Sequence, residues 1–303
     1  MVGRAARALP WAAVVAVFLL MTIGNIVSAT GSGLACPDWP LCHGRLIPPL
    51  EADVLIEYSH RLTAALASVL LITTIIATIR GSSARGVRRV GIALLVLFGA
   101  QIALGGVTVL LRLPHLISTA HLVNALLILG GLVVLASRTG GAGVPARADQ
   151  VARLGRVGLT VLLLQLAIGG YVRHTGAGLA CPDFPLCSGA ILPEHWLAAV
   201  HWVHRWLGVT LLGLFLHLAQ AGRGTALARG TAVTAALAAL QVGLGIAAVV
   251  LGLEPPIRAL HAAAGYALWG ALVWISARAG CWRGALAETP GPRHEGAEVA
   301  HGS

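Results

Sequence analysis

Four histidines occupy equivalent places in two halves of the chain. The segment TIGNIVSATGSGLACPDWPLCHG in the first half matches AIGGYVRHTGAGLACPDFPLCSG in the second. The match continues downstream, where His60 falls on His204 and His121 falls on His261. A repeat of this length indicates a duplicated structural unit. Each unit therefore contributes one pair of histidines.

Each of these histidines lies near the end of an apolar stretch. A polar side chain in such a stretch is costly, and by default it marks a functional site that faces the interior of a helix bundle. Two imidazoles from facing helices are the ligands that six-coordinate haem iron accepts. The alternative is a set of hydrogen bonds between packed helices. Duplication of all four positions favours one haem-sized site per half.

The residue three places before the first histidine of each pair differs between the halves. Glu57 precedes His60, whereas His201 precedes His204. Because residues i and i+3 share a helix face, Glu57 is expected to point into the same cavity as His60. A carboxylate beside one tetrapyrrole alone suggests that one site does chemistry while the other relays electrons or stores oxidising equivalents. The simpler alternative is that Glu57 orients a histidine or lies in interfacial water.

Other residue types around the histidines suit the same interpretation. Arg61 and Arg205 each follow a histidine, and their guanidinium groups could pair with haem propionates or extend to the membrane interface. Small residues lie on the neighbouring stretches, where a planar macrocycle would need room, although they also serve helix packing. These small residues are Gly105, Gly106, Gly243, Gly245 and 262–265.

Four of the five cysteines form two motifs with one spacing, Cys36-x5-Cys42 and Cys181-x5-Cys187. This spacing favours a disulfide within each motif and leaves Cys281 alone. It differs from the Cys-x-x-Cys spacing of thioredoxin-like centres. We therefore expect structural disulfides that clamp a loop over each site, with redox-active thiols as the alternative.

The composition identifies the elements that must position these residues. The chain is 57% hydrophobic and 11% charged, far less charged than soluble domains are. A helix needs about 20 apolar residues to cross a bilayer, and the chain is expected to be an all-α, polytopic membrane protein. The first apolar run is expected to be retained rather than cleaved as a signal peptide. The expected spans are 9–29, 57–79, 90–111, 117–137, 155–172, 199–220, 231–252 and 258–277.

The net charge of +10 reflects topology better than it reflects a nucleic-acid partner, and none is expected. Most arginines lie in the termini and in the loops after the second, fourth and sixth spans. The positive-inside rule makes that side cytoplasmic, with both termini. The cysteine loops then face the extracytoplasmic space, where disulfides persist. A multi-pass protein of the cell (plasma) membrane is predicted.

The repeat also predicts the domain organisation. Each half is expected to form a four-helix bundle of the same orientation, and the two bundles are expected to be pseudo-symmetric. Residues 1–138 form the first half and residues 155–280 form the second. Residues 139–154 are rich in Gly, Pro and Arg and are expected to be a cytoplasmic linker. Residues 281–303 are expected to be a disordered cytoplasmic tail.

The chain resembles the haem A synthase family in several motifs spread over eight spans. These are Glu57-x-x-His60-Arg61, the loop Cys36–Cys42, His121, His204-Arg205 and His261. The resemblance covers residues 9–278. It implies an enzyme that oxidises the methyl group at position 8 of haem O to a formyl group through successive hydroxylations. The product is haem A for cytochrome oxidase.

The family's functional residues fall on the residues already singled out. The resemblance implies that His204 and His261 ligate a haem b cofactor and that His60 and His121 ligate the substrate haem. It gives Glu57 the place of the family's essential acidic residue. The family's loop cysteines match the first pair here, and this chain repeats them in the second half, which some members lack. This difference argues against a redox role unique to the first pair.

The resemblance also implies partners, namely haem O synthase and assembly factors of cytochrome oxidase, and it leaves a homo-oligomer open. Three other functions compete with it. The histidines alone would permit a di-haem b-type electron carrier, from which Glu57 and exchange of the first-half haem would distinguish the enzyme. The cysteine pairs would permit a membrane thiol-disulfide oxidoreductase. A haem transporter or chaperone is the third, and turnover of haem O separates it from an enzyme.

Overall fold

The computed structural model describes residues 4–138, 145–283 and 286, and this part of the chain contains eight long α-helices. All eight are long and apolar enough to cross a membrane, which confirms the predicted spans. A short 3₁₀ helix, η1 (Ala177–Leu179), lies in the second cysteine loop. The α-helices are α1 (Arg4–Thr30), α2 (Ala52–Gly81), α3 (Arg85–Leu110), α4 (His115–Arg138), α5 (Asp149–His174), α6 (Trp196–Gly222), α7 (Ala228–Val250) and α8 (Pro255–Arg278).

The helix ends follow local sequence signals. α5 begins at Asp149, inside the predicted linker 139–154, because an acidic residue in the first turn is favourable beside the positive end of the helix dipole. Pro255 begins α8, where its missing N–H costs no helical hydrogen bond. Most of the predicted tail, residues 281–303, lies outside the described residues.

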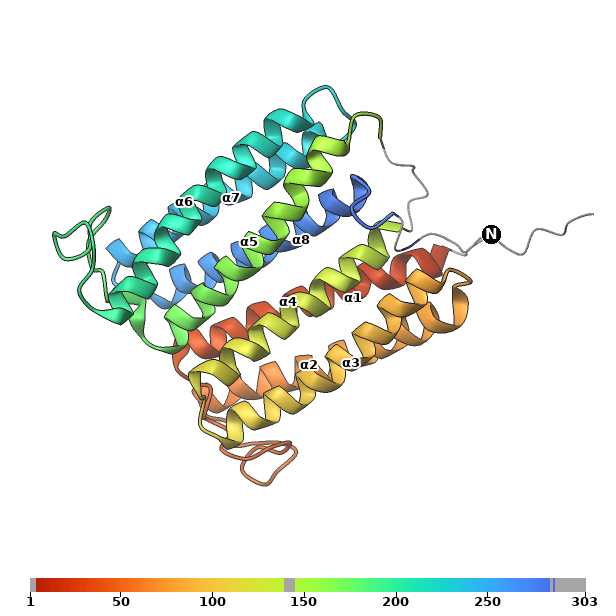
Figure 1. Ribbon diagram of the computed structural model, residues 1–303. Coiled ribbons are helices and arrows are strands. Elements are labelled where there is room, and N and C mark those ends of the chain that lie inside the picture. Colours follow the sequence, from red (N-terminus) through yellow and green to blue (C-terminus); the bar gives the residue numbers. More distant parts are fainter. Residues whose placement is uncertain (1–3, 139–144, 284–285, 287–303) are drawn as a thin grey trace, which may run out of the picture.

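Helices α1–α4 form one bundle and helices α5–α8 form a second beside it (Figure 1). In the first half, α1 packs on α2 and α4, and α3 packs on both α2 and α4. The helices α5, α6, α7 and α8 repeat this order in the second half. The halves meet where α1 contacts α8, α4 contacts α5 and α4 contacts α8. Exchanging α1 with α5 and α4 with α8 leaves this contact set unchanged, as expected for two units related by a pseudo-twofold axis.

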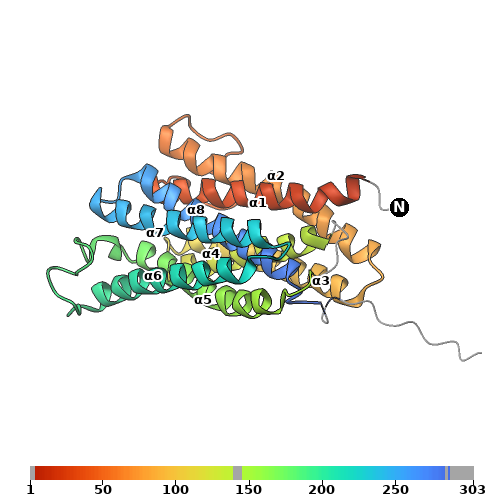
Figure 2. The same cartoon turned by 90° about the horizontal axis from the view of Figure 1, so that it is seen from above.

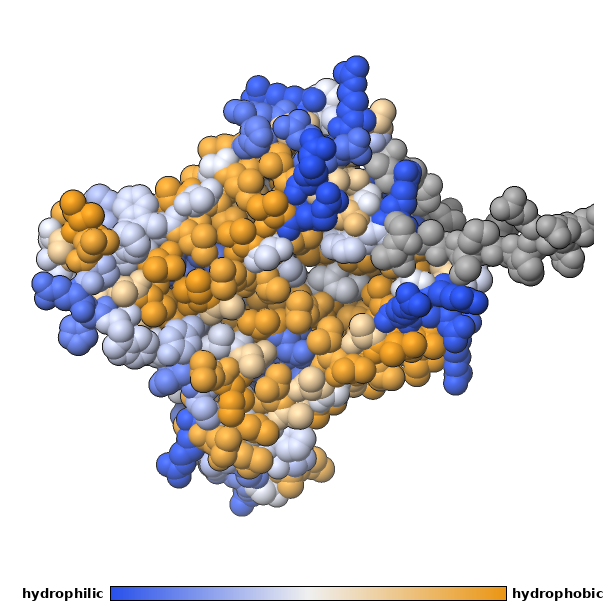
Figure 3. Space-filling model, viewed as in Figure 1, coloured by the Kyte–Doolittle hydropathy of each residue, from blue (hydrophilic) through white to orange (hydrophobic). Residues whose placement is uncertain are grey.

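The shared core lies along α4 and α8. In the most apolar window of each helix, 61% of α4 and 44% of α8 is buried, against 17% of α3 and α6. The indole N–H of Trp269 on α8 donates to the carbonyl of Leu126 on α4 over 2.7 Å. The outer helices expose apolar side chains, and Figure 3 shows a broad hydrophobic surface flanked by hydrophilic ends. This pattern fits contact with lipid along the helices.

Both cysteine loops lie at the same end of the bundle, which we call the loop end (Figures 1 and 2). They connect α1 to α2 and α5 to α6. The two shorter connections at this end, α3 to α4 and α7 to α8, also match in detail. The backbone N–H of Leu113 donates to the carbonyl of Thr108 over 2.8 Å. The N–H of its counterpart Leu253 donates to the carbonyl of Ala248 over 2.7 Å. The duplication therefore extends to the turns that place the histidines.

Candidate functional site

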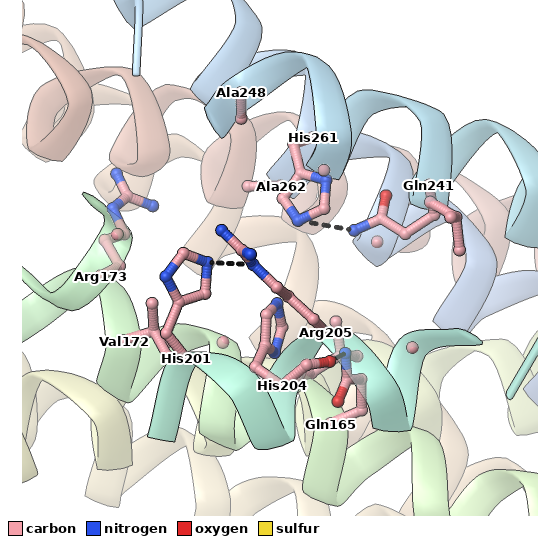
Figure 4. A pocket seen from close by; sticks show the side chains of 18 of the residues that line it. Gln165, Val172, Arg173, His201, His204, Arg205, Gln241, Ala248, His261 and Ala262 are labelled. Atoms are coloured by element: carbon pink, nitrogen blue, oxygen red, sulfur yellow. Dashed lines mark hydrogen bonds between the residues drawn. The ribbon is translucent and has the colours of Figure 1, made fainter. Parts of the chain in front are cut away.

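The second half contains a cavity of about 390 Å³ bounded by α5, α6, α7 and α8. His204 on α6 and His261 on α8 line it, with their ring centroids 6.5 Å apart and their planes at 82°. Figure 4 shows these rings together with His201, Arg173 and Arg205 around one space. The rest of the lining is mainly apolar and rich in glycine. Such a cavity suits a flat, largely apolar ligand with an atom that imidazole can bind.

Each of the four predicted histidines lies against a glycine on the neighbouring helix. A Cβ atom at Gly169 would lie 2.7 Å from Cε1 of His204, and one at Gly245 would lie 3.1 Å from Cε1 of His261. The first half repeats this arrangement with 2.7 Å from Gly24 to His60 and 3.2 Å from Gly105 to His121. The glycines admit the imidazole rings between the helices. Gly24 and Gly169 were not singled out from the sequence, although both recur in the repeat.

Polar atoms without partners gather in the second-half cavity. Ten buried side-chain nitrogen and oxygen atoms in the described residues have no hydrogen-bond partner. Because such atoms are rare in native proteins, each requires an explanation. Six of them belong to residues that line this cavity: Gln165, Arg173, His201, His204, Gln241 and His261.

The first half has the same orphaned imidazole nitrogens. Nδ1 of His60 and Nδ1 of His121 are buried without a partner, as are those of their counterparts. The side-chain amide of Gln101 donates to Nε2 of His121 over 3.2 Å, and Gln241 makes the equivalent 3.3 Å contact with His261. In each pair, one histidine has its Nε2 lone pair taken by a glutamine amide, which a bound iron would displace, and both rings lie against a helix face kept open by glycine. This donor set fits a haem iron in either half.

One difference between the halves concerns these glutamines. Asn124 on α4 donates to the side-chain oxygen of Gln101 over 2.6 Å and so fixes the amide beside His121. Ala264 takes the place of Asn124 in the repeat, and the oxygen of Gln241 stays unpartnered. The repeat aligns Gln101 with Gln241, but no role was predicted for either residue.

The two arginines that the sequence made candidates for binding propionates donate to the cysteine loops. Nη1 of Arg61 donates to the carbonyls of Asp38 (2.7 Å) and Leu41 (2.5 Å), and Nη2 donates to that of Cys36 (2.9 Å). Arg205 repeats these bonds on the equivalent carbonyls of Asp183, Leu186 and Cys181. Because both terminal nitrogens are engaged, each guanidinium anchors a loop to the helix that carries a histidine of the pair.

The remaining donor of each arginine points to the position that differs between the halves. Nε of Arg61 donates to Oε1 of Glu57 over 3.1 Å, and Nε of Arg205 donates to Nε2 of His201 over 3.2 Å. Glu57 and His201 are each only 4% exposed. His201 lines the second-half cavity, so the repeat places Glu57 at the corresponding space beside His60. Through Arg61, the carboxylate is linked to the first cysteine loop.

Three kinds of interaction hold each cysteine loop: a disulfide, the hydrogen bonds of an aspartate and those of an arginine. Cys36 is disulfide-bonded to Cys42 and Cys181 to Cys187, which confirms the predicted pairing. Within the first loop, the carboxylate of Asp38 accepts the backbone N–H groups of His43 and Gly44, each over 2.7 Å.

Asp183 does the same in the second loop with Ser188 (2.6 Å) and Gly189 (2.8 Å). The N–H of Gly44 or Gly189 holds the pKa of each aspartate below its usual value. The carboxylates, the disulfides and the arginines therefore give the CPD-x-PLC motif a structural explanation.

Comparison with known proteins gives one consistent family. Residues 7–273 match the family described as cytochrome oxidase assembly protein. The haem A synthase of Symbiobacterium thermophilum is 29% identical over 90% of this chain and 94% of its own length. The haem A synthase of Halalkalibacterium halodurans is 31% identical over 80% of this chain and 87% of its own length. The haem A synthase of Bacillus licheniformis is 27% identical over 90% of this chain and 95% of its own length. Since the match spans nearly all eight helices, this chain belongs to the family of cytochrome oxidase assembly proteins.

Proposed function

We propose that the protein is a haem A synthase, which oxidises the C8 methyl group of haem O to a formyl group. The observation that carries this proposal is the pair of equivalent histidine sites, of which only the first has a buried carboxylate, Glu57. The curated relatives carry the same name. Two sites of one architecture with one difference in acid-base chemistry suit an enzyme that holds one haem as cofactor and transforms another.

In this proposal, His204 and His261 would hold a haem b in the second-half cavity. The facing imidazole rings, the glycine-lined walls and the mainly apolar lining support that assignment. When bound, haem b supplies one-electron transfer. His60 and His121 hold the substrate haem in the first half by the same geometry. The residues 1–138 and 155–280 would then be a substrate half and a cofactor half.

Glu57 is the residue that we assign to proton handling. Oxidation of a methyl group releases protons as well as electrons, so a proton acceptor must lie near the reacting carbon. Arg61 holds Oε1 of Glu57, which fixes the carboxylate one helical turn before Arg61 and three residues from His60. Glu57 can accept a proton or position water there. His201 occupies this place in the second half, where no proton transfer from carbon is required.

The proposal includes a place in the cell. We assign the loop end to the extracytoplasmic side of the plasma membrane and both termini to the cytoplasm, because the arginines concentrate at the opposite ends of the helices. The disulfides at the loop end suit an oxidising compartment. Haem O synthase and other assembly proteins of cytochrome oxidase are the partners that a haem O-consuming enzyme would need.

Extraction of the bound haems tests the proposed function. The protein would be purified after co-expression with a haem O synthase, and its haems would be extracted in acidic organic solvent and identified by mass and absorption spectrum. We expect haem A and its hydroxylated precursor together with haem B. Haem B alone, although haem O is available, would overturn the proposal and favour a di-haem electron carrier. Unchanged haem O beside haem B would instead favour a haem transporter.

The glycine contacts give a second prediction. Gly169→Ala places a methyl group 2.7 Å from His204 and is expected to displace that ring and lower the haem b content severalfold. Gly243→Ala is the control, since nothing lies within 4 Å of its added Cβ. Alanine there should stabilise α7 slightly, by up to about 1 kcal/mol. Haem content per protein, measured by absorption, checks both variants, and equal haem contents would contradict the role assigned to Gly169.

A further inference from the structure

Two arginines at the loop end of the second-half cavity have no counterpart in the first half. Arg173 lies in the last turn of α5 and Arg258 in the first turn of α8, and both line the cavity that holds His204 and His261. The repeat pairs them with two serines, Ser28 and Ser118.

The two guanidinium groups lie close together. Nη2 of Arg173 donates to the carbonyl of Asn25 over 2.6 Å, and Nη1 of Arg258 donates to that of Ala29 over 3.3 Å. These acceptors are four residues apart on α1, which is about one helical pitch, or ~5.4 Å. One ligand with two acidic groups on the same edge could therefore reach both cations.

Neither cation has a carboxylate to balance it. Among the described residues, the only ion pair within 4 Å joins Arg61 to Glu57. No Asp or Glu of this part of the chain lines the cavity. Arg173 donates to the side-chain oxygen and the carbonyl of Asn25 and contacts the hydroxyl of Tyr266, all of them neutral groups, and its Nε is buried without a partner. Taking cations out of water without a counter-ion costs free energy, so an anion at this place would be strongly favoured.

We propose that Arg173 and Arg258 bind the two propionate groups of the haem held by His204 and His261. This inference rests on the proposed function, which places a haem in this cavity, and it names the residues that orient and retain it. A haem has an apolar ring and two carboxylates on one edge, and the cavity has mainly apolar walls and two cations at one end. Charge-assisted hydrogen bonds from arginine to carboxylate are among the strong ones.

The inference also explains why the halves differ. A cofactor must stay bound through many turnovers, whereas a substrate must enter and its product must leave. Arginines in the second half and serines in the first give the two sites the corresponding difference in retention. Arg61 and Arg205 cannot produce this difference, because both are engaged by loop carbonyls in the same way.

A structural role is the competing explanation, since both arginines also tie α1 to the second half. Asn25→Ala separates the two. It removes the side-chain acceptor of Arg173 and the 3.0 Å bond from Asn25 Nδ2 to the carbonyl of Ala259, yet it keeps both guanidinium groups. Asn25→Ala would weaken the contact between α1 and the second half, but it would not weaken the binding of carboxylates by the two arginines.

The test compares haem b with its dimethyl ester, in which both carboxylates are neutralised. The full-length protein carries His60→Ala and His121→Ala, so that only the second site is titrated after haem removal. With both arginines present, we expect haem b to bind about 100-fold more tightly than the ester, roughly tenfold per arginine. Arg173→Ser with Arg258→Ser should abolish this preference, and the lysine pair should restore part of it. Asn25→Ala should keep the preference.

Three outcomes would overturn the inference: an unchanged preference in the serine variant, an equal loss of affinity for both ligands, or loss of the preference in Asn25→Ala. The lysine pair keeps the test decisive if the serine variant does not fold, because a purely structural tie would give no preference that follows charge. Failure of the proposed function is seen separately, as haem extracts without haem A despite an intact preference for the free acid.

Discussion

Glu57→Gln is expected to lower the formation of haem A roughly 10²- to 10⁴-fold while both haems remain bound. Glutamine keeps the size of the side chain and an oxygen that can accept the hydrogen bond from Nε of Arg61. The loop anchor therefore survives, and only the ability to take up a proton is lost. The ratio of haem A to haem O in extracts of the purified protein measures the effect.

Glu51→Gln is the matched control for this variant. Glu51 lies just before α2, is exposed and makes no side-chain capping bond, so its amide should leave the haem ratio unchanged. A Glu57→Gln protein with full activity would count against both proposed roles of the carboxylate, proton acceptor and positioner of water. Loss of activity accompanied by loss of haem would point to the structural role, in which Glu57 only holds Arg61.

His261→Ala and His121→Ala are expected to remove different haems. His261 belongs to the cavity that we assign to haem b, so its loss should release most of the haem B from the purified protein. His121 lies at the equivalent place in the first half, against Gly105. Its loss should abolish haem A and retain haem B. Extraction and identification of the haems from each variant measures both effects.

The control is His217→Ala, which changes an exposed histidine on α6 away from the cavity lining. It should leave both haem contents as they are. If His121→Ala released haem B and His261→Ala did not, the assignment of cofactor and substrate to the two halves would be reversed. If both variants lost the same haem, the two histidines would belong to one site.

The two halves differ where their functions are proposed to differ. The helices, disulfides, loop anchors and histidine-glycine contacts recur almost unchanged. Apart from Asn124, which Ala264 replaces, the differences described above lie at Glu57 against His201 and at the serines that replace Arg173 and Arg258. One difference places acid-base chemistry in the first half, and the other places cations in the second. A duplicated scaffold thus supports two tasks through changes at a few positions.

The sequence by itself determined the number of helices, the repeat, the histidine pairs and the disulfides. A span must be long and apolar enough to cross hydrocarbon, so its presence can be read directly. Two cysteines six residues apart have few other partners, and all four of these cysteines are paired as the spacing predicted. Recurrence of His60 at His204 and of His121 at His261 separated these histidines from the others.

Only the tertiary structure decided what the long and the small side chains do. The sequence made Arg61 and Arg205 candidates for pairing with haem propionates. In the fold, the cysteine loops bring three backbone carbonyls to each guanidinium. Arg173 and Arg258 are far apart in the chain, and the packing of α5 against α8 brings them together, with each guanidinium donating to α1. In a membrane helix, both lipid-facing and buried faces are apolar, so hydropathy does not reveal which face meets a neighbour. That choice depends on the packing of all eight helices.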